Sequence, residues 1–384
     1  MAGDSKNNSL NTPARFKIPD YLYRLKESIP AWMEKLEHPD GIGRYRLALE
    51  AYLPYDTLAS SMAHCVLNIT QAEHPYLRDT EQAHAWADYL LSHQQEDGHI
   101  LDEAQENRML RGKDGEPPSE KMQLDHRRGQ TRNILYIAYR LGRLPRYPQR
   151  HKDGFRNADD LVAWLEGLHW QNPWGAGSWA SAALSFQFFN KLLGDEDAAA
   201  LIDVGRQWLM ERQDPKTGTW SDGSEIAPHI LVNGIFKVWM GIPFHGVSVQ
   251  YCEPIIDLCI ETLLHDPAVC KRFDACSVFD VATVLDICLR HVEYRKDEIA
   301  GLAAAYLPEL ECMVQDDGGM SYFPEGSRRH ELVPDIRQSA LDGTALHCQA
   351  LALLANLCGL RDELGWVPCT EWHVGYPLYS NASA

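Results

Sequence analysis

The chain has 384 residues, of which 54 are acidic and 36 are lysine or arginine, so its formal net charge is −18. Hydrophobic residues make up 45% of the sequence and charged residues 23%, which is typical of a globular protein with a sizeable core. The acidic balance disfavours DNA, RNA and anionic membranes as main partners, because binding to them depends on neutralising phosphates with basic side chains.

Residues 1–15 are polar, and we expect them to form a disordered tail in front of a single domain over residues 16–384. The tail lacks the apolar segment of a secretory signal, and no stretch approaches the roughly 18 apolar residues of a membrane span. We therefore expect a cytoplasmic protein. The ten cysteines form no C-x-x-C pair, so neither a disulfide framework nor a zinc site of paired cysteines is expected.

Apolar residues recur at three- and four-residue steps along most of the chain, which predicts amphipathic helices. In chain order, the predicted helices lie at Ile42–Leu53, Thr57–Ile69, Glu81–His93, Gln130–Leu141, Ala158–Leu168, Trp179–Leu193, Asp195–Glu211, Ile230–Met240, Cys252–Leu264, Ser277–Arg290, Asp297–Gln315 and Ala340–Leu360. The sequence shows no hairpin of alternating strands and no βαβ alternation. The predicted fold class is therefore all-α.

A loop of similar composition recurs along the chain: Gln, a short polar stretch, Gly and often an aromatic residue. It occurs at Gln95–His99, Gln171–Trp179, Gln213–Trp220 and Gln315–Tyr322. The glycines of these loops, Gly98, Gly177, Gly218 and Gly319, are 79, 41 and 101 residues apart. These spacings are close to two, one and two units of about 40–50 residues. A helical hairpin of that length cannot bury its apolar faces alone, so we expect about six or seven hairpins to stack into a closed ring of inner and outer helices.

These loops resemble the repeats of the (α/α) toroid families. Gln213–Trp220 looks like a lengthened QW motif of squalene and oxidosqualene cyclases, and Gln315–Gly319 resembles the related repeat of protein prenyltransferase β-subunits. The resemblance implies an (α/α)6-type toroid with a central cavity, a fold that polysaccharide lyases and glycoside hydrolases also use. It does not choose among these chemistries, because one fold hosts many.

A polar stripe on one predicted helix marks the leading candidate site. His229, Asn233 and Lys237 follow one another at four-residue steps and share one face of a helix that is otherwise apolar. Buried polar groups need partners, and the hollow of a ring would supply them. We expect His229 and Tyr251, which precedes the next helix, to be the base and acid, with Asn233 neutralising a carboxylate of the substrate.

Further residues are candidates for the same chemistry. His126 is an alternative acid or base, and Arg127 beside it would help to neutralise the carboxylate. Glycoside hydrolysis needs two carboxylates, and the candidates are Glu253, Asp274, Asp280 and Asp342. Asp280 interrupts an apolar helix, which favours an inward-facing carboxylate. Sugar rings would stack on aromatic faces, for which the candidates are Trp174, Trp179 and Trp220.

The function expected first is cleavage of a glycosidic bond in an oligosaccharide, by elimination or hydrolysis and without a cofactor. A second enzyme class, isoprenoid cyclisation or prenyl transfer, stays open. Protein prenyltransferases hold zinc with an Asp-x-Cys pair and a later His, which Asp274, Cys276 and His347 resemble. A third hypothesis is a non-enzymatic helical-repeat scaffold, which predicts no cluster of perturbed titratable groups inside the ring. The sequence leaves the oligomeric state open.

Overall fold

The computed structural model describes residues 16–71, 76, 79–110, 117–150, 157–223 and 225–368. The predicted tail at residues 1–15 and the end of the predicted domain, residues 369–384, lie outside them. The all-α prediction is confirmed for the described residues, which contain no β-strand and only isolated antiparallel bridges. In the same part of the chain, no helix is both long and apolar enough to cross a membrane.

Many helices begin at a side chain that accepts a hydrogen bond from the first free backbone N–H groups, as Asp56, Asn157 and Asp274 do. The helices are α1 (Asp20–Leu36), α2 (Thr57–Thr70), α4 (Thr80–Leu91), α5 (Glu103–Met109), α6 (Glu120–Arg140), α7 (Ala158–Glu166), α8 (Pro173–Leu192), α9 (Ala198–Arg212), α10 (Pro228–Trp239), α11 (Ile242–His245), α12 (Cys252–His265), α13 (Pro267–Cys270), α14 (Ala275–Leu289), α15 (Lys296–Glu309), the 3₁₀ helix η1 (Leu310–Met313), α16 (Leu341–Leu357) and α17 (Arg361–Leu364).

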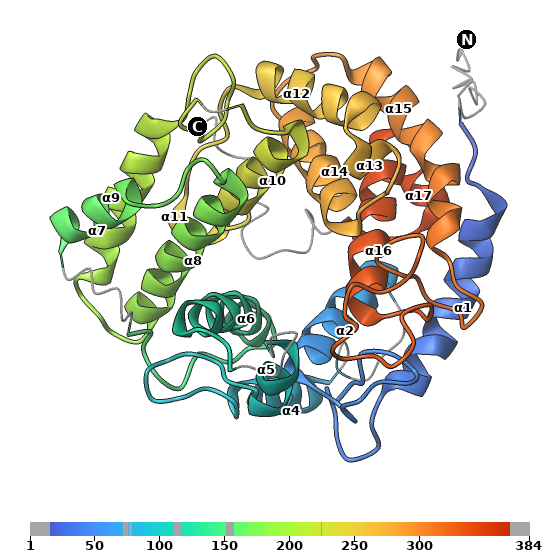
Figure 1. Cartoon of the computed structure of the whole chain (residues 1–384), viewed down its shortest axis with the longest axis horizontal. Helices are drawn as coiled ribbons and strands as arrows, with labels where there is room; N and C mark the ends of the chain where they lie inside the picture. Colours follow the sequence, from blue (N-terminus) through green and yellow to red (C-terminus); the bar gives the residue numbers. More distant parts are fainter. Residues whose placement is uncertain are drawn as a thin grey trace, which may run out of the picture.

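Six of the described helices contact one another in a closed sequence: α2 with α6, α6 with α8, α8 with α10, α10 with α14, α14 with α16, and α16 with α2. Figure 1 shows these six around the centre of the molecule, with α4, α7, α9, α12 and α15 outside them. Burial follows this arrangement. α14 and α16 are buried on nearly every side, whereas α9 and α15 bury only part of their surface.

Two glycines let α8 and α10 approach closely. A Cβ atom on Gly177 of α8 would lie 2.9 Å from the carbonyl oxygen of Gly234 on α10. A Cβ on Gly234 would lie 2.7 Å from Cβ of Pro173, at the start of α8. Side chains larger than hydrogen would therefore push these two helices apart.

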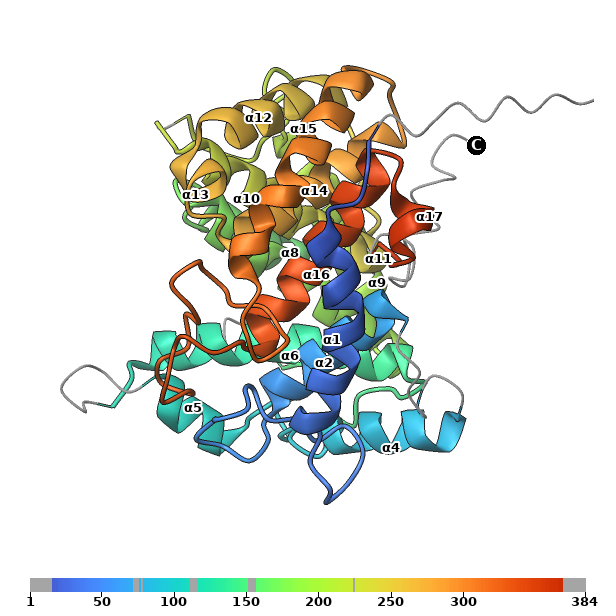
Figure 2. The same cartoon turned by 90° about the vertical axis from the view of Figure 1, so that its right-hand side faces the viewer.

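The helix α1 is not predicted by the periodicity of the sequence, and it carries Pro30 in its interior. It lies on the outside of the molecule (Figure 2). There the Tyr21 hydroxyl donates a hydrogen bond of 2.6 Å to the Leu307 carbonyl of α15. Its buried face supplies apolar residues to the common core, so packing against neighbours stabilises a helix that the local sequence does not mark.

The predicted helix Ile42–Leu53 is wrong. The segment is irregular, and its backbone N–H groups bond to other parts of the chain: that of Arg46 to the Leu36 carbonyl and that of Tyr52 to the Leu332 carbonyl. Three apolar residues of the segment, Tyr45, Leu47 and Ala48, are buried in the core without a helix. Tertiary contacts override the local pattern here.

The Gln–Gly loops after α4 and α9 are tight turns. The Gln213 side chain donates to the Gly218 carbonyl at 2.8 Å, and Gln94, the neighbour of the predicted Gln95, donates to the Gly98 carbonyl at 2.9 Å. Both glycines adopt a positive φ, of 71° and 91°, which disfavours other residues. The side-chain amides thus hold the turns that connect neighbouring helices.

The segment Gln171–Trp179 is not a turn of this kind. Asn172 accepts a hydrogen bond from the Gly175 N–H and caps α8, and Pro173 takes the first helical position. α8 therefore begins six residues before the predicted Trp179.

Candidate functional site

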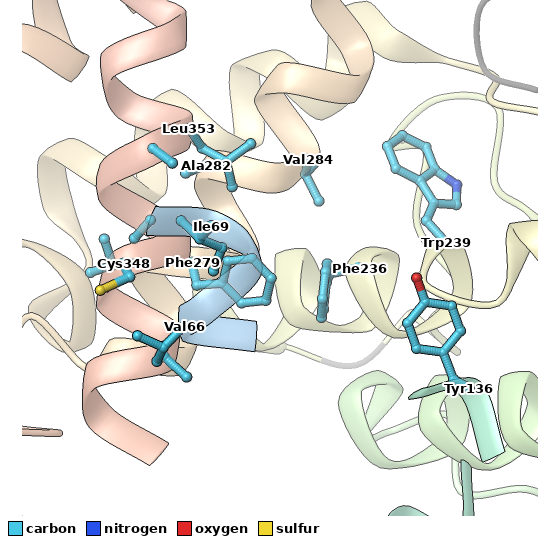
Figure 3. Packing of buried hydrophobic residues seen from close by; sticks show 14 of the residues in the cluster. Val66, Ile69, Tyr136, Phe236, Trp239, Phe279, Ala282, Val284, Cys348 and Leu353 are labelled. Carbon is cyan, nitrogen blue, oxygen red and sulfur yellow. The ribbon is translucent and has the colours of Figure 1, made fainter. Parts of the chain in front are cut away.

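A cavity of about 220 Å³ lies among the central helices. Its walls come from α2, α6, α10, α14 and α16, together with Phe244 of α11 and Arg328 of the segment between η1 and α16. The apolar and aromatic part of the lining consists of Met62, Tyr136, Ile137, Phe236, Met240, Phe244, Phe279 and Leu346. Figure 3 shows Phe236 and Phe279 side by side, and their ring centroids lie 5.1 Å apart.

Charged side chains interrupt this apolar lining. Of the described residues, Arg132 of α6, Lys237 of α10, Asp280 of α14 and Arg328 line the cavity. Asp280 is fully buried, and its Oδ2 lies 3.9 Å from Nζ of Lys237 and 4.0 Å from Sγ of Cys276. Its Oδ1 has no hydrogen-bond partner among the described residues. The carboxyl group is thus held in place but incompletely satisfied.

Burial changes the acidity of both Asp280 and Arg132. Burial raises the pKa of Asp280 to about 7, although the charges of Lys237 and Arg132 oppose that rise and Asp274 adds to it. Burial likewise lowers the pKa of Arg132 to about 10, against the opposing effect of Asp280. At neutral pH both protonation states of the Asp280 carboxyl are therefore populated, which suits a general acid or base.

The predicted polar stripe on α10 lies against α14. Asn233 is buried and its Nδ2 donates to the Ser277 hydroxyl at 3.4 Å, while Lys237, one turn later, reaches Asp280. The stripe therefore shares one face, as its spacing requires, and only Lys237 lines the cavity.

The first residue of the stripe, His229, is placed away from the cavity. Its Nδ1 and the Oδ2 atom of Asp266 lie 2.7 Å apart, and its backbone N–H donates to the same oxygen at 3.1 Å. Burial alone would raise the pKa of Asp266, but the hydrogen bonds from His229 outweigh it and lower that pKa. Tyr251 precedes the outer helix α12 in a left-handed conformation, and Glu253 is exposed on that helix. The structure does not bring His229 and Tyr251 together in the cavity.

His126 and Arg127 lie inside α6, which begins ten residues before the predicted Gln130. The Arg127 guanidinium makes two hydrogen bonds of 2.6 Å to the Glu106 carboxylate of α5, and these bonds raise the pKa of Arg127. Burial lowers the pKa of His126. Neither residue is part of the described lining of the cavity.

The three predicted stacking tryptophans do not line the described cavity either. Trp220 is buried, and its indole N–H donates to the Leu209 carbonyl at 2.7 Å, so it holds α9 against the following loop. Trp174 packs against a small cluster that contains Cys276 and Tyr322. The Trp179 ring lies under the guanidinium of Arg128, with Cζ 3.4 Å from the ring centroid.

Two of the suggested zinc ligands, Asp274 and Cys276, make other contacts. Asp274 caps α14 and accepts a hydrogen bond of 3.4 Å from the Tyr322 hydroxyl. Burial raises the pKa of the Cys276 thiol to about 11 and lowers that of His347 to about 4. Within the described residues, no group of three or more His, Cys, Asp or Glu side chains could hold a metal ion.

Sequence reasoning missed two of the cations in the cavity. Arg132 lies one turn before Tyr136 in the apolar part of α6. A charged residue within an apolar helical pattern could have indicated a side chain that faces a cavity. Arg328 lies in an irregular segment and pairs with the buried Asp342 of α16 at 3.3 Å. No local pattern marks it, because its place in the cavity depends on how that segment folds back onto the helices.

In comparisons with known proteins, no family model, no curated protein and no solved structure matches the chain. The geometry of its own residues therefore carries the functional argument.

Proposed function

We propose that the chain is an enzyme of (α/α)6-toroid architecture that transfers a proton to or from a small, mainly apolar substrate in the central cavity. Asp280 is its general acid and base. One observation carries the proposal: a fully buried carboxyl group, with a pKa of about 7 and one oxygen without a partner among the described residues, lies on the wall of a largely apolar cavity.

The lining favours isoprenoid chemistry over glycosidic cleavage. Sugar hydroxyls need many hydrogen-bonding partners, whereas apolar atoms make up the larger part of the surface of this cavity. A hydrocarbon chain fits such walls, and the faces of Phe236 and Phe279 can stabilise a positive charge that develops on carbon after protonation. The walls also restrict water, which would otherwise capture such a cation. The proton is the only reagent that this step requires.

The closed sequence of helix contacts supports the toroid architecture. A scaffold that binds another protein on its concave face would not require a titratable group poised near neutral pH inside the ring. Asp280 is such a group, which supports an enzyme over the scaffold hypothesis.

The test is turnover in D₂O with a panel of prenyl alcohols and prenyl phosphates, with products analysed by mass spectrometry. A panel of uronate oligosaccharides is run in parallel, with ultraviolet absorbance reporting an unsaturated uronate. We expect a prenyl product that carries deuterium on carbon. Asp280→Asn should lower its rate by about 10²- to 10⁴-fold, the usual contribution of a general acid.

Asp286→Asn is the matched control, because Asp286 is a second buried aspartate on α14 outside the described cavity lining. It should keep turnover close to that of the wild type. Cleavage of uronate oligosaccharides, or full activity of a folded Asp280→Asn variant, would show the proposal to be wrong.

A further inference from the structure

The charges in the cavity do not balance. Lys237 and Arg132 both act electrostatically on the single carboxylate of Asp280. Arg328 and Arg329 share a separate partner, Asp342, each at 3.3 Å. Arg132 reaches only the carbonyl and the hydroxyl of Ser178, at 3.3 and 3.2 Å, and its Nε has no hydrogen-bond partner among the described residues. Two cations thus share one carboxylate, although buried charges are stable only when they are paired.

We infer that the ligand of this cavity is an amphiphilic organic anion whose carboxylate or phosphate group binds between Arg132 and Lys237, and that its binding makes Asp280 take up a proton. The inference rests on the proposed function, because it concerns the same cavity and the same acid. The apolar lining would hold the body of the ligand, and the two cations would hold its charged end. The ligand would thereby supply the negative charge that the free cavity lacks.

Proton uptake follows from the change of partners. In the free protein, Lys237 and Arg132 favour the ionised form of Asp280. A bound anion takes over these cations and adds a like charge nearby, and both effects favour the protonated form. The proton comes from solvent, so one anion and one proton enter together. Binding would thus convert Asp280 into the acid that the reaction needs.

Other groups around Asp280 do not compete for this proton near neutral pH. Burial raises the pKa of the Cys276 thiol to about 11 and that of the Cys65 thiol to about 12, so both stay neutral. The remaining polar or charged side chains that face Asp280 or line the cavity around it are Asp274, which caps α14, Ser61 of α2, Asn133 and Tyr136 of α6, Gln349 of α16 and Arg328. Asp280 is therefore the group whose protonation a bound anion would change.

The linkage has a definite sign. Since the ionised form of Asp280 must take up a proton for the anion to bind, affinity should fall as pH rises above about 7. The expected loss approaches tenfold for each pH unit, because one proton is bound with each anion.

The experiment is isothermal titration calorimetry of the full chain at pH 7.5 in two buffers of different ionisation enthalpy. The probes are hexanoate and hexyl sulfate, which do not titrate near this pH, with hexanol as the uncharged probe of similar size. We expect both anions to bind more tightly than hexanol and to take up a large fraction of one proton. The relative affinities of hexanoate and hexyl phosphate then show whether a carboxylate or a phosphate fits the two cations better.

Variants separate the two parts of the inference. Arg132→Gln and Lys237→Gln should each weaken anion binding by about tenfold or more, the usual effect of losing a charge-assisted hydrogen bond. Asp280→Asn should bind hexanoate at least as tightly as the wild type, without proton uptake and without the dependence on pH. Arg337→Gln is the control for a lost positive charge, since Arg337 is exposed and pairs only with Asp335 among the described residues.

The inference is overturned if hexanol binds as tightly as hexanoate, if the wild type takes up no proton, or if neither cation variant weakens binding. Lys237→Gln provides the decisive result should Arg132→Gln fail to fold. Binding of the probes is measured without turnover. Probe binding with proton uptake but no prenyl product would therefore uphold this inference and reject the proposed reaction.

Discussion

The two buried aspartates of α14 have the same depth but different surroundings. Asp286 accepts hydrogen bonds from Nη2 of Arg290 at 2.8 Å and from Nδ2 of Asn356 at 2.7 Å. Asp280, six residues earlier on the same helix, has Lys237 at 3.9 Å and one oxygen without a partner among the described residues. Asp286 is thus tied to its neighbours, whereas Asp280 can still bind something else. Burial alone does not mark a functional carboxylate; burial with missing partners does.

The largest expected effects are on the free energy of unfolding, and they have opposite signs for substitutions of Asp286 and Asp280. Asp286→Ala removes the acceptor of the hydrogen bonds from Arg290 and Asn356, so it should lower the free energy of unfolding by about 2–4 kcal/mol. Burial raises the pKa of Asp280 in spite of the nearby Lys237 and Arg132, so the uncharged side chain of Asp280→Asn should raise the free energy of unfolding by about 1–3 kcal/mol at pH 8. Denaturant unfolding measures both. A similar loss of stability in both variants would remove the distinction between the two carboxyl groups.

The gain from Asp280→Asn should depend on pH. The pKa of Asp280 is about 7 in the folded chain, against 3.8 for an aspartate in an unfolded chain. The folded state therefore binds more protons than the unfolded state between these two values, and the wild type loses stability as pH rises through that range. The difference between variant and wild type should be small below pH of about 4 and reach its full size above about 7. Unfolding midpoints across this range measure it, and a constant difference would contradict the assignment.

Lys237→Gln should raise the pKa of Asp280. Lys237 has the largest effect in lowering the pKa of Asp280, so its loss should move the titration midpoint of that carboxyl group upward, by about one unit. Carbon-13 NMR of labelled aspartate follows the titration. The Asp286 signal serves as the internal reference and should stay in place. A midpoint that falls, or does not move, would show that Lys237 does not act on Asp280.

The smallest expected effect concerns a third carboxylate, Asp266, whose partner is His229. His229→Ala removes this hydrogen bond, and we expect a loss of about 1 kcal/mol in the free energy of unfolding. Because His229 is not part of the described cavity lining, binding of hexanoate should stay at the wild-type level. Loss of hexanoate binding in this folded variant would show that His229 contributes to the candidate site.

The sequence predicted those parts of the molecule that depend on local pattern. The period of apolar residues identified α2, α7, α10 and α12 to within a few residues, because an amphipathic helix carries its own signal. The inward-facing position of Asp280 was predicted for a similar reason, since a charged residue in an otherwise apolar helix can be recognised from the local sequence. α1 was missed, because packing outweighs its interior proline.

The composition of the site was less predictable. Arg132, Lys237 and Asp280 come from three helices, and which faces of those helices meet depends on how the helices pack together. The spacing of His229, Asn233 and Lys237 showed that they share a face, but it could not show that the first of them meets Asp266. The direction in which a polar face points is a tertiary property.

The close approach of α8 and α10 also bears on the acid site. Gly234 lies one turn before Lys237, and its backbone packs closely against Pro173. A methyl group at Gly234 would displace α10 as a body, and with it the ammonium group that tunes Asp280. The proton affinity of this carboxyl group therefore depends on how α10 packs against α8, at a position outside the described cavity lining.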